Sequence, residues 1–491
     1  MEGVGLNERV ELDGKSDREV EKSPVEKCEE SLALQIDQQA EARLVRKLDI
    51  YIIPIITLLV NIGNARLYGL ERDLKLKGNQ YQIAVSLLFV TYILGELPSN
   101  LIIKKIGPSR WVPFLCICWG LIATLTGVVR NFAGLVACRL LLGLFEGGLF
   151  PGIAVYLTLF YRKNELALRV GYLFVSAAIA GAFGGLLAFA IGHMNGVAGQ
   201  SGWRWIMILE GIPTILLGIF AWFWMADSPE TAHYLTEEEK QLLLTRRSRE
   251  AGQTASAQEL DWEDVILGLK DWKIWAFCIA QFGVDTMLYG FSTFLPTIIK
   301  GINPKWSSPM VQVLTIPCYT VGAFTYLSTA WLSDRYQRRG LPLVSLSLVV
   351  IVGYAMLLSN GGSGVHYAGC FFVAMGLYIG PGLPVAWLAN NNPRYGKRAT
   401  AIALLLMIGN CAGIMAPFLY PSKEGPRYVR GQAVTIGLVA MAGLVHAFMT
   451  VYFAKTNKSR ARGDENAIMN GLSEEEIEEL GDRNPRFVYA F

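Results

Sequence analysis

Long apolar segments, separated by short polar ones, run through the whole chain and leave few folds open to it. A helix that crosses a bilayer needs about 20 predominantly apolar residues. By this criterion we predict helices near 48–69, 81–103, 111–129, 133–160, 169–192 and 203–226, and a second set near 272–299, 309–333, 341–359, 364–390, 397–420 and 431–454. The predicted fold class is therefore an all-α membrane protein with about 12 transmembrane helices in two six-helix halves.

The composition agrees with a membrane protein and gives no sign of an enzyme. Of 491 residues, 52% are hydrophobic and 17% are charged, whereas soluble proteins have about 25% charged residues. The net charge of +3 gives no nucleic-acid signal. The cysteines lie mostly in apolar segments, which favours buried single thiols over disulfides. We find no nucleotide-binding glycine loop, catalytic triad or metal-ligand cluster, so we expect no catalytic residues, no cofactor and no metal site.

Polar segments divide the chain and predict its orientation. We assign 1–47 and 455–491 to tails, 227–271 to a central loop, and 48–226 and 272–454 to the two six-helix halves. Lys and Arg gather in the loops after the second, fourth, eighth and tenth helices, and loops rich in these residues face the cytosol. We therefore expect both tails and the central loop on the cytosolic side.

Two opposite charges stand inside the fourth apolar segment. Arg139 and Glu146 are seven residues apart, or about two helical turns, so they share one face of a helix. Each charge costs about 2.5–3.5 kcal/mol at the bilayer centre, so this face is expected to point into the bundle or a watery cavity. The pair predicts a site for an anion and a proton. The alternative is a buried structural ion pair.

Other polar side chains inside the predicted helices of the first half are candidates for the same site. Tyr92 could line the cavity. Glu96 comes just before a proline, so capping and anchoring the next loop explains it at least as well as transport does. We expect Glu210, in the sixth helix, to pair with Arg204 rather than to bind a substrate.

The second half has its own polar candidates. Asp285 is either a second proton site or polar lining, and Tyr289 lies one turn further along the same helical face. Asn410, in the eleventh helix, is a candidate substrate contact because a buried amide needs hydrogen-bond partners.

Two loops resemble those of the major facilitator superfamily. The segment Ala330-Trp-Leu-Ser-Asp334-Arg335-Tyr-Gln-Arg338-Arg339-Gly340 looks like the family's loop between helices eight and nine. The stretch from Asn100 to Arg110 is the matching loop of the first half, although Lys104 stands where the superfamily usually has Asp. The resemblance implies that these loops gate the conformational change, through Asp334, Arg335, Arg338, Arg339, Lys104, Lys105 and Arg110.

Within that superfamily the chain is similar to the fungal anion:cation symporters of the allantoate permease group. The similarity covers nearly the whole chain, including the blocks Asn61-Ile-Gly-Asn64-Ala-Arg66, Gly202-Trp-Arg-Trp205, Asn390-Asn-Asn392 and the ending Asp482 to Phe491. It implies uptake of a small organic anion driven by protons, by a monomer in the plasma membrane. The partners are then the anion, protons and the lipid bilayer, with no nucleic acid.

The same resemblance implies roles for individual residues. Arg139 would help to hold the substrate carboxylate, and Glu146 would take the coupling proton, with Asp285 as a second candidate. The substrate-binding set that we predict is Arg139, Tyr92, Asn64, Tyr289 and Asn410. Similarity of the second half to nicotinate permeases makes nicotinate the first substrate hypothesis; pantothenate, allantoate and biotin-like acids stay open.

Two alternative functions remain open from the sequence. A drug-type exporter of this superfamily would carry Gly-Pro-x-x-Gly-Gly in helix five, whereas Gly181 is followed here by Ala182. A non-transporting homologue or sensor stays open because helix one is short. The family has an Asp-Arg pair just before Asn61, but here Leu59-Val60 runs directly into it. A mis-joined exon, a natural variant in which Arg66 substitutes, or a degenerate copy would each explain the gap.

Overall fold

The computed structural model describes residues 40–41, 43–53, 70–161, 169, 187, 190–191, 194–251, 262–336 and 338–491. The first predicted helix, with its gap before Asn61, and the fifth lie largely outside these residues. The chain divides into two compact units, Met1–Leu48 and Asp49–Phe491. Everything below concerns the second unit.

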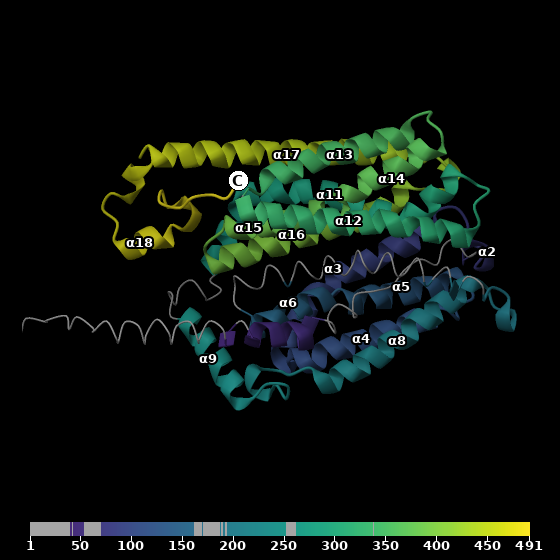
Figure 1. Cartoon of the computed structure of the whole chain (residues 1–491), viewed down its shortest axis with the longest axis horizontal. Helices are drawn as coiled ribbons and strands as arrows, with labels where there is room; N and C mark the ends of the chain where they lie inside the picture. Colours follow the sequence, from purple (N-terminus) through teal and green to yellow (C-terminus); the bar gives the residue numbers. More distant parts are fainter. Residues whose placement is uncertain are drawn as a thin grey trace, which may run out of the picture. The chain divides into compact units, whose positions relative to one another are not determined.

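All regular elements among the described residues are helices (Figure 1). The first half contains α2 (Leu70–Asp73), α3 (Gln80–Ile106), α4 (Pro108–Thr126), α5 (Phe132–Glu146), α6 (Leu149–Phe160) and α8 (Gly202–Trp224). The polar connection contains α9 (Glu237–Ala251) and α10 (Trp262–Lys270). The second half contains α11 (Trp272–Ile302), α12 (Ser308–Tyr336), α13 (Gly340–Leu358), α14 (Ser363–Leu377), α15 (Ile379–Asn390), α16 (Tyr395–Met415) and α17 (Val429–Ala461), and α18 (Glu474–Glu479) follows.

These helices confirm the predicted fold class. Within the described residues, eight helical segments are long and apolar enough to cross a membrane. Together with α3 and the pair α5–α6, they account for the predicted spans other than the first and the fifth. The chain is therefore an all-α, multi-pass membrane protein.

The fourth and tenth predicted spans, 133–160 and 364–390, are each two helices rather than one. The first breaks at Gly147-Gly148, between α5 and α6, and the second breaks at Tyr378, between α14 and α15. In both spans a proline is the third residue of the new helix, Pro151 in α6 and Pro381 in α15. A proline is tolerated there because the first turn of a helix has no internal acceptor for its N–H groups.

Glycine lets the helices of the first half come close together. A Cβ on Gly143 of α5 would lie 2.1 Å from the Leu88 carbonyl oxygen of α3, and one on Gly147 would lie 2.2 Å from the Tyr92 carbonyl oxygen. Neither space admits a side chain, so the backbones of α3 and α5 pack directly against each other, as small residues allow in membranes. The break in the fourth span is thereby held beside α3.

The two halves meet through α3, α11 and α16. Ser86 Oγ of α3 donates a hydrogen bond to the Ile414 carbonyl oxygen at 2.7 Å, and Figure 1 shows α3 beside α16. The Phe89 ring packs edge-on against Tyr289 of α11, with ring centroids 4.6 Å apart. These contacts place the polar residues of α3 next to those of α11 and α16.

The last helix is longer than predicted, because α17 runs to Ala461 rather than ending near 454. The extra turns are polar, and two of their side chains, Asn457 and Arg460, bind the chain that follows. Asn457 pairs with the backbone of Tyr489, and Arg460 donates to the carbonyl oxygens of Asp482 and Phe487. The polar tail therefore folds back onto the second half.

Candidate functional site

The charged pair predicted in the fourth span lies on α5. The Asn131 side chain caps the N-terminus of this helix, because its Oδ1 atom accepts a hydrogen bond from the Gly134 amide at 2.8 Å. Arg139 and Glu146 are both partly buried, and the Glu146 carboxylate lies within electrostatic range of the Arg139 guanidinium. The structure describes no hydrogen bond or ion pair between them, so they do not form a closed structural pair in this conformation.

The second half contributes a buried carboxylate on α11. Asp285 is 5% exposed and accepts hydrogen bonds from Gln281 Nε2 at 3.1 and 3.0 Å. The same Gln281 amide reaches the Pro381 carbonyl oxygen of α15 at 3.3 Å. Gly409 of α16 lies against this group, since a Cβ there would be 2.1 Å from Asp285 Oδ2. A glycine in α16 therefore makes the room that Asp285 occupies.

Tyr289, one turn beyond Asp285, joins α11 to α16. Its hydroxyl donates to Asn410 Oδ1 at 2.6 Å. The hydroxyl also lies within electrostatic range of Asp285 in its own half and of Tyr92, Glu96 and Glu146 in the other half. Tyr92 in turn lies within range of Glu146. The structure therefore brings six of the predicted residues into one region at the contact between the halves, which we call the central polar site: Tyr92, Arg139, Glu146, Asp285, Tyr289 and Asn410.

The remaining predicted residues are either outside the described part of the chain or away from this site. Asn64 is outside the described residues, and the side chains of Lys104 and Asp334 are too. Lys105, Arg110, Arg335 and Arg338 are exposed, and none of them contacts the central polar site. Arg339 is buried and donates to Ser333 Oγ at 3.3 Å, within the α12–α13 loop region.

The expected pairing of Glu210 with Arg204 is wrong. Arg204 Nη1 donates instead to the Gly127 carbonyl oxygen at 2.9 Å, and its guanidinium stacks on the Trp203 ring. Glu210 is buried in α8, and its Oε2 atom has no hydrogen-bond partner. The packing of α8 against α4 places Arg204 beside the end of α4, where backbone carbonyl groups lack partners within the helix.

The sequence analysis did not identify three residues that contact the central polar site or the first-half loop. Gln281 stands one turn before Asp285 on the same face, a spacing that could have indicated it. Phe89 has no polar group and no sequence signal. Asp227, just after α8, accepts from the Ser109 amide at 3.2 Å, so it supplies a carboxylate to the first-half loop in which Lys104 replaces the usual Asp.

The described helices define a multi-pass membrane protein. The sequence model of the Major Facilitator Superfamily matches residues 51–417, so the chain belongs to this superfamily. It is a secondary transporter for a small substrate, and not an enzyme.

Individual relatives agree with this assignment. The chain is 39% identical to an uncharacterised transporter of Schizosaccharomyces pombe, over 91% of this chain and 90% of that one. It is 32% identical to the high-affinity nicotinic acid transporter of Saccharomyces cerevisiae, over 92% of this chain and 85% of that one. Among solved structures, a bacterial homologue of the lysosomal transporter Spinster, inward-facing and unoccupied, superimposes with a TM-score of 0.61 at 16% identity, covering 84% of this chain and 96% of that chain. That likeness shows the fold alone.

Proposed function

We propose that the chain is a proton-coupled importer of a small organic anion, a vitamin-like or nitrogen-source carboxylate, within the fungal anion:cation symporter group. Nicotinate is the first candidate, and pantothenate or allantoate comes next. The observation that carries the proposal is the central polar site, where one guanidinium and carboxylates from both halves lie in one region. The similarity to a nicotinic acid transporter supports the choice of substrate.

Arg139 is the proposed anchor for the substrate carboxylate. No hydrogen bond or ion pair in the described part of the chain engages its guanidinium, although the side chain is partly buried. A guanidinium stays charged and presents paired donors that match a carboxylate in geometry. An unengaged guanidinium inside a bundle therefore fits an anion that arrives and leaves.

Glu146 is the proposed carrier of the coupling proton. Its carboxylate lies within range of Arg139, and no hydrogen bond or ion pair within the described residues engages it. A proton on Glu146 would cancel one negative charge and leave Arg139 to the substrate anion. Binding of proton and anion would then favour each other. Asp285 is the second candidate, because it places a buried carboxylate of the second half in the same site.

Transport would proceed by alternating access, in which the two halves rock around a site near the bilayer midplane. Tyr92, from the first half, and the bonded pair Tyr289–Asn410, from the second, would contact the substrate from opposite sides. A monoanion moving with one proton is electrically silent. With a second proton, the membrane potential adds about 2.3 kcal/mol per charge per 100 mV. The loops around Lys105 and Arg338 would gate the motion.

The proposed setting is the plasma membrane, with both tails in the cytosol and the protein working as a monomer.

The alternatives of an exporter and of a non-transporting homologue make different predictions for uptake. An exporter would lower cellular accumulation of its substrate, and a non-transporting chain would leave it unchanged. Sequencing the transcript across codons 55–65 would show whether the short helix one is a mis-joined exon.

The deciding experiment is uptake of labelled nicotinate, pantothenate and allantoate by cells that express the chain, at acid pH, with and without a protonophore. Arg139→Ala is compared with Arg130→Ala, which removes an exposed arginine of the α4–α5 loop. We expect protonophore-sensitive uptake of one acid that Arg139→Ala abolishes and Arg130→Ala retains. Uptake that survives Arg139→Ala, or that ignores the protonophore, would overturn the proposal.

A further inference from the structure

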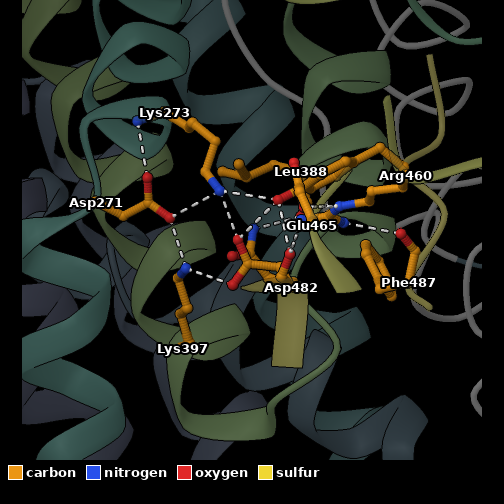
Figure 2. Close-up of polar contacts among 10 residues, drawn as sticks. Asp271, Lys273, Leu388, Lys397, Arg460, Glu465, Asp482 and Phe487 are labelled. Carbon is orange, nitrogen blue, oxygen red and sulfur yellow. Dashed lines mark hydrogen bonds and ion pairs between the residues drawn. The ribbon is translucent and has the colours of Figure 1, made fainter. Parts of the chain in front are cut away.

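The segment Asp482–Phe491, after α18, lies against the ends of four helices of the second half. Its first residue enters a buried ion cluster, shown in Figure 2. Asp482 Oδ2 lies 2.5 Å from Lys273 Nζ of α11, and Asp482 Oδ1 lies 2.7 Å from Lys397 Nζ of α16. Asp271, which caps α11, lies 2.5 Å from Lys397 and 3.4 Å from Lys273. Each of the two ammonium groups thus lies next to both carboxylates.

Charge balance makes this cluster depend on the tail. Asp482 and Lys397 are 3% and 4% exposed, and a buried charge is costly unless an opposite charge accompanies it. Without Asp482, two ammonium groups on different helices would share the single carboxylate of Asp271 and repel each other. The tail therefore supplies the charge that lets α11 and α16 lie side by side at this end.

Further along, two asparagines bind the backbone of the tail. Asn457 of α17 donates to the Tyr489 carbonyl oxygen at 2.8 Å and accepts from the Tyr489 amide at 2.9 Å. Asn391, at the end of α15, pairs in the same way with Ala490, at 3.0 and 2.8 Å. Trp387 Nε1 adds a bond to the Ala490 carbonyl oxygen at 2.8 Å. Each amide side chain satisfies both backbone groups of one residue, as a neighbouring strand would.

The last residues also contact the loop between α12 and α13. The Arg339 amide donates to the Phe491 carbonyl oxygen at 3.1 Å, and the Arg338 guanidinium lies over the Phe491 ring. This loop is the one that we expect to gate the conformational change. The tail thus links it to α11, α15, α16 and α17.

We propose that Asp482–Phe491 is an intramolecular clasp that fixes these helix ends and the α12–α13 loop so that the second half moves as one body during transport. Asp482 and Asn457 are its positioning residues. The clasp ties α11 to α16, and these two helices carry Tyr289 and Asn410 of the central polar site. The inference rests on the transporter class of the chain. Only its link to the central polar site rests on the proposed function.

The test compares Asp482→Asn, which breaks the ion cluster, with Asn457→Ala, which removes two backbone bonds elsewhere in the clasp. The control is Glu474→Gln, because Glu474 pairs with Arg486 at 2.6 Å on the exposed surface of the same tail. Hydrogen exchange of the full chain reports the amides of the clasp, of the α12–α13 loop and of the adjoining ends of α11 and α16. Uptake per folded molecule reports transport.

Both test variants should speed exchange in the loop and in the ends of α11 and α16, not only in the tail, and Glu474→Gln should not. Turnover should fall about tenfold, a size typical of coupling between sites, while the dissociation constant of the substrate stays near the wild-type value. Faster exchange confined to the tail, with wild-type turnover, would overturn the clasp. If Asp482→Asn does not fold, the exchange and turnover of Asn457→Ala decide whether the clasp exists. If the wild-type chain moves none of the acids, the proposed substrates fail, and exchange alone decides the clasp.

Discussion

At the residue scale, the central polar site depends on charges that are close but not bonded. Arg139 and Glu146 share a face of α5 and lie within electrostatic range, yet the structure describes no ion pair between them. A closed pair would have to be broken for each substrate molecule. Two groups that lie close without a bond can bind an anion and a proton and still influence each other, which is what the proposed coupled transport requires.

Glu146→Gln tests the coupling role directly. Glutamine keeps the shape of the side chain but cannot release a proton. In vesicles with a clamped membrane potential, a gradient of one pH unit is worth about 1.4 kcal/mol per proton, or about tenfold accumulation. We expect that accumulation from the wild type and none from Glu146→Gln, which should still exchange labelled for unlabelled substrate. The exposed Glu238→Gln of α9 is the control. Accumulation by Glu146→Gln would show that another group carries the proton.

Sequence alone predicted the members of the site better than its assembly. Arg139 and Glu146 could be assigned to one helical face because residues seven apart are about two turns apart. Asp285 and Tyr289 could be assigned to one face because they are about one turn apart. The contact of Phe89 with Tyr289, and the room that Gly409 leaves for Asp285, depend on how separate helices pack. A glycine or phenylalanine in an apolar helix has no signal that distinguishes such a contact from ordinary packing.

At the element scale, length and hydropathy predicted where the spans lie but not where they break. A Gly-Gly pair inside an apolar run stays compatible with a helix, and only the structure shows that this pair ends α5 and that Gly147 lies directly against α3. The docking of the tail onto the second half could not be predicted from the sequence either. Its polar composition is typical of a solvated segment, and its contacts use backbone groups and partners up to 216 residues away, as in the bond of Lys273 to Tyr489.

The pH dependence of the docked tail follows from Asp482. Burial raises its pKa, but the ammonium groups of Lys273 and Lys397 outweigh that effect and hold the pKa below the ordinary value of 3.8. A lowered pKa stabilises docking above the ordinary value, and that stability is lost as pH falls through the folded pKa. The protection factor of the Ala490 amide should therefore stay constant at neutral and mildly acid pH and decline only below 3.8. Loss of protection near pH 6 in hydrogen exchange would contradict this.

At the scale of the whole molecule, the halves meet where α3 packs on α11 and α16. With the proposed topology, Ser86, Phe89 and Ile414 lie on the outer side of the central polar site, because α3 begins outside and α16 ends there. These contacts hold the outer ends of the halves together. Alternating access requires that they separate in each cycle, so they must be close enough to exclude water and weak enough to open.

Gly413→Ala tests this contact, because a Cβ on Gly413 would lie 2.3 Å from the Phe89 ring. Overpacking of this kind costs about 1–3 kcal/mol, or about tenfold in the balance between the closed and open outer side. We expect spin labels at the exposed positions 77 and 305 to show a larger fraction of long distances. The same change in a Phe89→Leu chain should shift that fraction much less, since the clash is relieved. Gly437→Ala, with nothing within 4 Å, should leave it unchanged. An equal shift in both backgrounds would mean that the two residues do not meet at a moving contact.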